Sequence, residues 1–239
     1  MLKIISFTIC PFVQRVTALL EANKLAYDIE FISLSDKPDW FLKLAPNGQV
    51  PVLVTESGTA LFESDAIVEY IEEAYAPLEA GLTSEQKAIN RAWSYLASKQ
   101  YLVQCSSMRS ADSKTYIERS AKMHKALATI SQHKAPGAYF NGHQLSLVDM
   151  AWLPVLHRAA IIKQHTQLDL LAPWPSLQAW QQSLADTGLF AASVADDFED
   201  KFINFYLAET TYLGKLSRNA APASQSEESA CEASVGGCC

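Results

Sequence analysis

The chain has 239 residues, 49% of them hydrophobic, with a formal net charge of -7 and a mean hydropathy of +0.01. This length is enough for one large or two modest domains with a real core. The acidic balance and the lack of a basic stripe argue against nucleic acid or an anionic membrane surface as a partner. Because no run of 18 apolar residues occurs, we expect no membrane-spanning helix.

The first 77 residues predict a small α/β domain. Strands are expected in "LKIISF" and "AYDIEFISL", with a helix over residues 11–23 between them. A short helix in "KPDWFLKLAP" and two strands in "VPVLVT" and "TALF" come next, and a helix over residues 64–75 closes the domain. The predicted order is βαβαββα.

After a linker at 78–82, residues 83–215 predict an all-helical domain. Thr83 with Gln86 and Ser146 with Asp149 have the spacing of capping boxes at the starts of two long helices. In the first of these helices, a stripe of apolar residues is expected to face the core: Ile89, Trp93, Leu96 and Val103. The last segment, 216–239, is rich in Ala, Ser and Gly without periodicity, and we expect it to be disordered.

The cysteines indicate a reducing compartment. They number five, at Cys10, Cys105, Cys231, Cys238 and Cys239. An odd count with three in the last nine residues is not typical of a disulfide framework. No signal peptide is recognisable at the start of the chain, so we expect a cytoplasmic protein.

One cysteine stands at the junction between the first strand and the first helix, in "SFTICPFVQRV". If Cys10 caps the helix that begins at Pro11, its sulfur faces backbone amides without helical partners. These amides and the helix dipole favour an anion, so a thiol here is expected to have a lowered pKa and to be reactive. Phe12 is expected to cover one side of the sulfur.

The alternative is that Cys10 is a buried structural cysteine, since a free cysteine packs like a small hydrophobic residue. The strand-to-helix junction and the Cys-Pro pair favour the reactive interpretation. Position 13 is Val, so the motif lacks the second thiol of a C-x-x-C pair. A site with one thiol needs a second thiol from outside, and glutathione is the abundant one.

Three motifs carry a resemblance to a known family. They are "CPFVQR" (10–15), "DKPDWFLKLAPNGQVPVL" (36–53) and "FESDAIVEYIEEAY" (62–75). Together with the "SLVD" cap, they make residues 1 to about 215 similar to the cytosolic glutathione transferase superfamily, most of all to its omega-type members with a catalytic cysteine. The resemblance implies an α/β thioredoxin-like domain followed by an all-α domain, and it does not extend over the tail.

The resemblance also implies a glutathione site. Cys10 is the expected nucleophile, and the expected glutathione-binding residues are Phe12, Lys37, Val50, Pro51, Glu63 and Ser64. Val50, before a cis Pro51, is expected to pair its backbone with the cysteinyl part of glutathione. Ser64, as a helix N-cap, is expected to hold the γ-glutamyl carboxylate and Glu63 the ammonium, and Lys37 the glycyl carboxylate. These assignments have structural alternatives: Val50 and Pro51 as the start of a strand, Glu63 and Ser64 as a plain helix cap, and Lys37 as a solvated surface lysine.

The expected activity is glutathione-dependent thiol transfer, in which Cys10 removes glutathione from a mixed disulfide; dehydroascorbate reduction is implied as related chemistry. The alternatives are a non-catalytic binding or regulatory protein with this fold and a conjugating transferase. We expect a disulfide or electrophile as co-substrate, bound between the domains and facing the helix at 84–110. A homodimer is implied by the resemblance only. The five histidines show no metal-ligand spacing, so no metal is expected.

Overall fold

The computed structural model describes residues 1–75 and 77–220. The N-terminal domain consists of β1 (Leu2–Ser6), α1 (Pro11–Ala22), β2 (Tyr27–Phe31), α2 (Asp39–Leu44), β3 (Val52–Val54), β4 (Ala60–Phe62) and α3 (Ser64–Ala74). This is the βαβαββα order that the sequence predicts. α3 ends at Ala74 and the next helix begins at Ser84, on either side of the segment predicted to be a linker.

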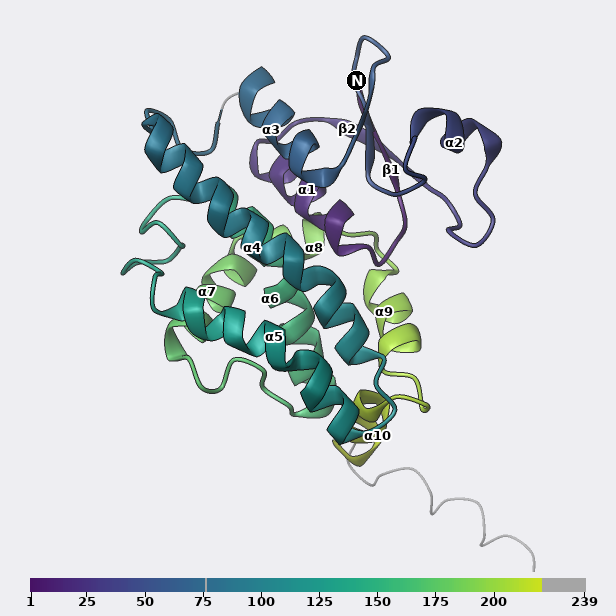
Figure 1. The fold of residues 1–239 in the computed structure, drawn as a ribbon, viewed down its shortest axis with the longest axis vertical. Helices are drawn as coiled ribbons and strands as arrows, with labels where there is room; N and C mark the ends of the chain where they lie inside the picture. The colour runs from purple at the N-terminus through teal and green to yellow at the C-terminus, as the bar shows by residue number, and fades with distance from the viewer. Residues whose placement is uncertain (76, 221–239) are drawn as a thin grey trace, which may run out of the picture.

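The four strands form one mixed sheet in the order β2-β1-β3-β4. β1 pairs in parallel with β2 and antiparallel with β3, and β4 pairs antiparallel with β3. Because successive side chains of a strand point to opposite faces, Ile4 packs in the core with α1 and α3, whereas Ile5 packs with Phe41 of α2. In Figure 1, α1 and α3 therefore lie on the side of the helical domain and α2 on the outer side.

The helical domain consists of α4 (Ser84–Met108), α5 (Ser113–Ser131), α6 (Leu147–Thr166), α7 (Pro175–Asp186), α8 (Leu189–Ala192), α9 (Phe198–Tyr206) and α10 (Tyr212–Ala220). α4 packs against both α5 and α6. Both predicted capping boxes are confirmed, at Thr83 for α4 and at Ser146 for α6. The Asp149 side chain of the second box is fully buried and also accepts hydrogen bonds from the Phe140 amide (2.9 Å) and the Trp180 indole (2.6 Å).

The predicted core stripe of α4 is confirmed for Trp93, Leu96 and Val103, which are partly buried against the hydrophobic core, and is wrong for Ile89, which is 57% exposed. The fully buried face of the helix is largely polar. Two donors of that face find partners on α6: Gln104 donates to the Val155 carbonyl (3.0 Å) and the Tyr101 hydroxyl to the Ala151 carbonyl (2.5 Å). α4 is thus fastened to α6 by side-chain hydrogen bonds as well as by apolar contact.

The two domains share a core. α1 packs against α6 and α8 of the helical domain, and one hydrophobic cluster continues from the sheet through α1 into α6 and α7. Thr17 of α1 donates to the Ser193 carbonyl (2.6 Å) after α8. α1 is therefore held from both domains.

Residues 216–220, expected to belong to a disordered tail, continue α10. Two contacts order this end: Leu216 packs against the cluster around Phe202, and Arg218 pairs with Glu209 (2.6 Å). The rest of the predicted tail lies outside the described residues.

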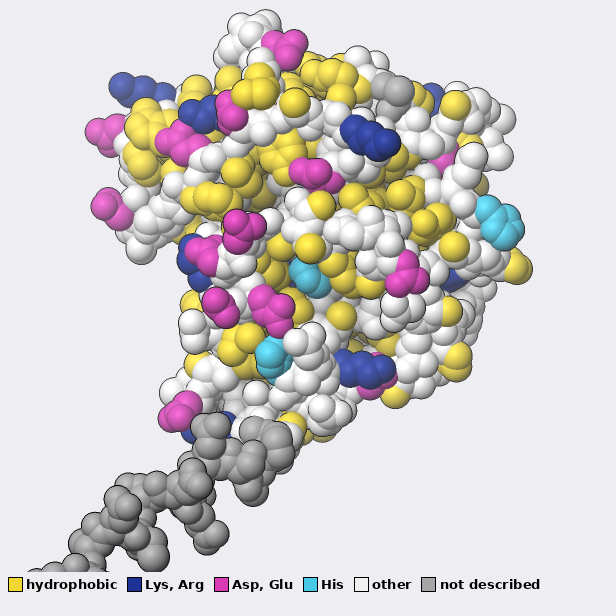
Figure 2. Space-filling view, turned by 180° about the vertical axis from the view of Figure 1, so that it is seen from behind, with side chains coloured by type: hydrophobic (Ala, Val, Ile, Leu, Met, Phe, Trp, Pro, Cys, Tyr) yellow, Lys and Arg dark blue, Asp and Glu magenta, His cyan; other side chains and the backbone are white. Residues whose placement is uncertain are grey.

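The surface seen in Figure 2 carries acidic and basic side chains interspersed with hydrophobic ones, and no continuous basic patch is visible on that face. In the part of the chain that the structure describes, no helix has both the length and the apolar character needed to cross a bilayer. Within the same residues, no group of three or more His, Cys, Asp or Glu side chains is arranged to hold a metal ion.

Candidate active site

Cys10 occupies the N-cap position of α1, as predicted, with Pro11 as the first helical residue. Its amide donates to the Phe7 carbonyl (3.0 Å) and its carbonyl accepts from the Gln14 amide (3.1 Å). These bonds fix a tight connection between the end of β1 and the helix. The Cys10 side chain is partly buried, packs against the core and is not in a disulfide.

The electrostatics of Cys10 differ from the sequence-based expectation. Burial raises the pKa of the Cys10 thiol to about 11, although the amides of Val13 and Phe12 and the Arg158 guanidinium oppose this shift. The helix start therefore favours the thiolate as predicted, but the loss of solvation outweighs it. In the free protein at neutral pH the sulfur carries its proton, so the prediction of a lowered pKa is wrong.

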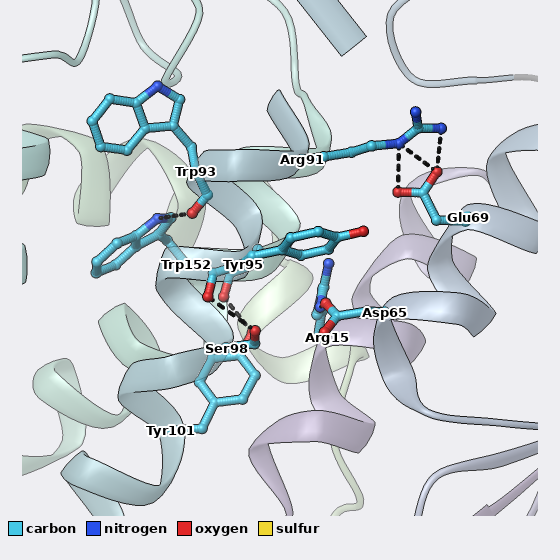
Figure 3. A network of polar contacts seen from close by, with 10 residues as sticks. Arg15, Asp65, Glu69, Arg91, Trp93, Tyr95, Ser98, Tyr101 and Trp152 are labelled. Atoms are coloured by element: carbon cyan, nitrogen blue, oxygen red, sulfur yellow. Dashed lines mark hydrogen bonds and ion pairs between the residues drawn. The ribbon is translucent and has the colours of Figure 1, made fainter. Parts of the chain in front are cut away.

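Phe12 lies at the contact between the two domains. Its ring meets Tyr101 of α4 edge to face, with the ring centroids 5.0 Å apart. Because the Tyr101 hydroxyl is bonded to α6, Phe12 connects the N-cap of α1 to both long helices. Figure 3 shows Tyr101 on α4 close to the α1 residue Arg15 and the α3 residue Asp65.

The Val50-Pro51 peptide bond is cis, as predicted. Pro51 is buried directly before β3, whereas Val50 is partly buried and packs against the same core as Cys10. Since β3 lies next to β1 in the sheet, the cis peptide and the start of α1 are neighbouring features of one sheet end. This is the arrangement that the resemblance implies for the backbone partner of a bound tripeptide.

The start of α3 differs in detail from its prediction. Glu63, not Ser64, holds the N-cap position, and its backbone has a positive φ of 67° with ψ 115°. Ser64 is the first helical residue and is 5% exposed. The exposed Glu63 carboxylate accepts a hydrogen bond from the Asn47 side chain (2.8 Å). The helix start thus presents a buried hydroxyl and an exposed carboxylate on one short segment.

Asp65 follows Ser64 and could repel an anion at this helix start. It is ion-paired with Arg15 of α1, whose side chain is 2% exposed. Figure 3 shows this pair in the space between α1, α3 and α4. The pairing neutralises Asp65 and leaves the amides of α3 free to favour a negative ligand.

Lys37 lies in the loop before α2. Its Nζ is close to Gly48, within 3.6 Å of the position that a β-carbon would take there. Among the described residues, no carboxylate forms an ion pair with Lys37. Lys37 is therefore near the loop that leads to the cis peptide and has its charge available for a ligand.

A hollow of about 550 Å³ opens beside the loop that precedes Cys10. Its lining comes from that loop, the end of β2 and α9, and includes Ile9, Phe31, Lys201, Asn204 and Phe205. This hollow lies against α9, whereas the expected co-substrate pocket faces α4; a second hollow, between α3 and α4, includes Glu69, Asn90 and Arg91 in its lining. The sequence signal that was missed is "KFINFYL", in which α9 keeps an aromatic residue partly exposed.

Trp93 of α4 does not line this hollow. Its ring packs against His133 and Phe140, inside the helical domain and away from this hollow. Arg109 lies over the Phe205 ring, 5.1 Å from its centroid, and so supports one wall of the hollow without being part of its lining.

Comparison with protein families agrees with the fold and the motifs. The model of the glutathione S-transferase N-terminal domain matches residues 9–74, and the model of the C-terminal domain matches residues 117–182. The chain belongs to the glutathione S-transferase family.

Two curated relatives illustrate the similarity. The probable glutathione S-transferase DHAR1 of Oryza sativa subsp. japonica is 32% identical over 157 residues, which cover 65% of this chain and 70% of that protein. Glutathione S-transferase omega-1 of Rattus norvegicus is 26% identical over 216 residues, 87% of either chain. The chain is therefore of the omega-like type.

Solved structures give the same result. Glutathione transferase Omega 3C from Trametes versicolor superposes with a TM-score of 0.69 at 26% identity, covering 82% of this chain and 89% of that one. Rice GST1, solved in complex with glutathione, shares the fold with a TM-score of 0.73 at 20% identity, over 92% of this chain and 97% of that one.

Proposed function

We propose that this protein is a glutathione-dependent thiol transferase in which Cys10 is the nucleophile. In the first step the Cys10 sulfur attacks the glutathione sulfur of a mixed disulfide R-S-S-G. The bond between the two substrate sulfurs breaks, the new bond joins Cys10 to glutathione, and the thiol proton leaves with R-SH. A second glutathione then attacks the Cys10 adduct, which yields oxidised glutathione and returns the thiol.

The observation that carries this proposal is the position of Cys10 at the start of α1, beside the end of β1 and the cis peptide. A thiol at this point meets the amides that favour negative charge on sulfur, and it has no second cysteine in its own motif. The attacking thiol of the second step therefore has to come from the ligand.

The residues proposed to bind glutathione surround the same end of the sheet. Val50 offers backbone groups before Pro51, Ser64 and the amides of α3 suit the γ-glutamyl carboxylate, and Glu63 suits the ammonium. Lys37 is proposed to meet the glycyl carboxylate. The Arg15–Asp65 pair supports this assignment because it removes a repelling charge next to the carboxylate site.

The raised pKa of Cys10 adds a condition. Because the resting thiol is protonated, the reaction depends on loss of that proton as the substrate binds. The amides of Phe12 and Val13 are in place to stabilise the negative charge as it forms on sulfur, and alignment of the sulfurs by the bound tripeptide adds a proximity effect.

We propose the hollow beside Ile9 as the co-substrate site. It adjoins the residue before Cys10 and combines aromatic walls with the polar groups of Lys201 and Asn204. The DHAR relatives support dehydroascorbate as one co-substrate, and a mixed disulfide of a small or protein thiol as another.

We propose a homodimer, because three apolar side chains of α4 remain exposed in the single chain: Ile89, Tyr95 and Leu102. A cytosolic location is proposed by analogy with the rice relative that is named cytosolic, although other relatives are named chloroplastic. Light scattering of the purified protein tests the dimer: a mass of two chains supports it and a mass of one chain overturns it.

The test of the activity is turnover of hydroxyethyl disulfide with glutathione, followed through oxidised glutathione. Wild type is expected to turn over and Cys10→Ala to lose the activity. The matched control is Cys105→Ala, which removes the other partly buried thiol of the described chain and is expected to keep turnover.

Two other results would identify the alternatives. Glutathione binding without turnover in wild type would indicate a binding protein. A Cys10→Ala variant that conjugates glutathione to 1-chloro-2,4-dinitrobenzene as well as wild type would indicate a conjugating transferase.

A further inference from the structure

Arg158 of α6 is a buried cation that forms no ion pair with any carboxylate of residues 1–75 or 77–220. Its side chain is fully buried, and its hydrogen bonds go to neutral oxygens: Gln14 Oε1 (2.5 Å), the Pro154 carbonyl (3.0 Å) and the Ile9 carbonyl (3.1 Å). Its Nε has no hydrogen-bond partner among the described residues. A buried guanidinium in this state is costly, because the removal of solvent is not offset by a nearby anion.

The acceptors on the N-terminal domain lie on both sides of Cys10. Ile9 directly precedes Cys10. Gln14 lies one helical turn after Cys10, and the Gln14 backbone amide donates a hydrogen bond to the Cys10 carbonyl. Arg158 therefore reaches from the helical domain and holds the backbone before the cysteine and the first turn of α1 after it. The side-chain nitrogen of Gln14 in turn donates to His157 Nδ1 (2.7 Å) and Ser193 Oγ (3.2 Å).

The titratable groups whose charges act on Arg158 are thiols and phenols: Cys105 on α4, Tyr206 on α9, Cys10 at the start of α1 and Tyr101 on α4. His157, next to it on α6, is kept neutral because burial lowers its pKa to about 3. Burial also raises the pKa values of Tyr101 and Tyr206. The phenols are thus poor sources of an anion, which leaves the thiolate of Cys10 or of Cys105 as the counter-ion. The bonds of Arg158 to Ile9 and Gln14, on either side of Cys10, favour Cys10.

We propose that Arg158 is the positioning residue of Cys10: it fixes the segment from Ile9 to Gln14 and supplies the positive charge that stabilises negative charge on the sulfur. The inference deepens the proposed function, on which its role in turnover rests. Its action on the sulfur itself can be measured without glutathione.

The experiment is alkylation of Cys10 by iodoacetamide between pH 7 and pH 10.5, with the modified peptide quantified by mass spectrometry. Arg158→Met is expected to slow alkylation at pH 8 about tenfold and to move the pH profile up by about one unit. Arg158→Lys, which keeps the charge, is expected to recover a large part of the rate. Arg119→Met, an exposed arginine of α5, is the matched control and is expected to leave the profile unchanged.

The pH profile separates this role from a merely structural one. If Arg158→Met lowers the melting temperature but leaves the pH profile of Cys10 in place, the proposal is overturned. Should this variant fail to fold, Gln14→Glu gives the same information. It sets a carboxylate against the guanidinium and is expected to move the profile upward, and an unchanged profile there also overturns the proposal.

Failure of the proposed function gives a different result. A protein that shows Arg158-dependent alkylation of Cys10 but no turnover with glutathione keeps the positioning role and loses the thiol-transferase activity. Turnover by wild type, together with a pH profile of Cys10 alkylation that does not depend on Arg158, keeps the thiol-transferase activity and overturns the positioning role.

Discussion

The Asn47 side chain donates a hydrogen bond to Glu63 Oε1 across 2.8 Å and so joins the loop before the cis peptide to the start of α3. Asn47 Oδ1 of the same side chain also accepts from the Gln49 backbone amide (3.1 Å). One side chain thus links two parts of the chain that are proposed to hold opposite portions of glutathione, near Val50 and at Glu63.

Asn47→Ala tests this link. Loss of the hydrogen bond leaves the exposed Glu63 carboxylate free to turn away from the ligand, so the KM for glutathione is expected to rise about threefold to tenfold with little change in kcat. Steady-state kinetics with varied glutathione measure it. Gln182→Ala, which removes an exposed side-chain bond on α7, is the control and should leave KM unchanged. An unchanged KM in Asn47→Ala would remove Glu63 from the ammonium site.

The ionisation of Cys10 is open to direct titration. Thiolate absorbance near 240 nm, taken as the difference between wild type and Cys10→Ala, isolates this one sulfur. Because burial raises the pKa of Cys10 to about 11, the difference signal is expected to be small at pH 8 and to grow about tenfold per pH unit below the midpoint. A midpoint below pH 8 would show that the amides at the helix start outweigh burial after all.

His157 is expected to limit stability in acid. Its ring stacks on Phe190 and Phe198 and accepts a hydrogen bond from Gln14, all of which suit the neutral form. Burial lowers its pKa from 6.5 to about 3. The unfolded chain therefore binds the proton first as the pH falls below 6.5, and this contribution to the free energy of unfolding is lost progressively down to about pH 3.

The expected loss from this group between pH 7.5 and pH 5 is about 2 kcal/mol. Urea unfolding at the two pH values measures it, and His157→Phe is compared with wild type. The variant has a lower stability at pH 7.5 because Gln14 loses its acceptor, but its decrease toward pH 5 is expected to be smaller by that amount. Equal decreases in both proteins would contradict the account.

Asp149 is predicted to be a main source of stability in the helical domain. Its carboxylate accepts from the Ser146 amide and hydroxyl, the Phe140 amide and the Trp180 indole. Asp149→Ala leaves buried donors without partners, so we expect a loss of at least about 3 kcal/mol in the free energy of unfolding. Asp186→Ala, at the exposed end of α7, should change it by less than about 0.5 kcal/mol. A loss below about 1 kcal/mol in Asp149→Ala would show that the capping network is dispensable.

The features that the sequence predicted well are local ones. The place of Cys10 before Pro11, the two capping boxes and the cis peptide at Pro51 depend on residues a few positions apart. Backbone sterics and the unpaired amides of a helix start act over this range, so a single sequence is sufficient to predict them.

The features that were missed depend on residues far apart in the chain. Arg158 is 148 positions from Cys10, and the loss of solvation that raises the pKa of the thiol comes from packing that no local pattern encodes. The polar buried face of α4 is another case, since Gln104 is acceptable in a core only because the Val155 carbonyl meets it. The hollow beside Ile9, which is proposed as the co-substrate site, depends in the same way on how α9 meets the loop at Ile9.

The most direct test of the whole account is to treat the protein with oxidised glutathione and to map the adduct by mass spectrometry. The account predicts a gain of one glutathione on the peptide that contains Cys10, lost on addition of reduced glutathione. Labelling at Cys105 or at the cysteines near the C-terminus, with Cys10 unmodified under conditions that allow exchange, would contradict it.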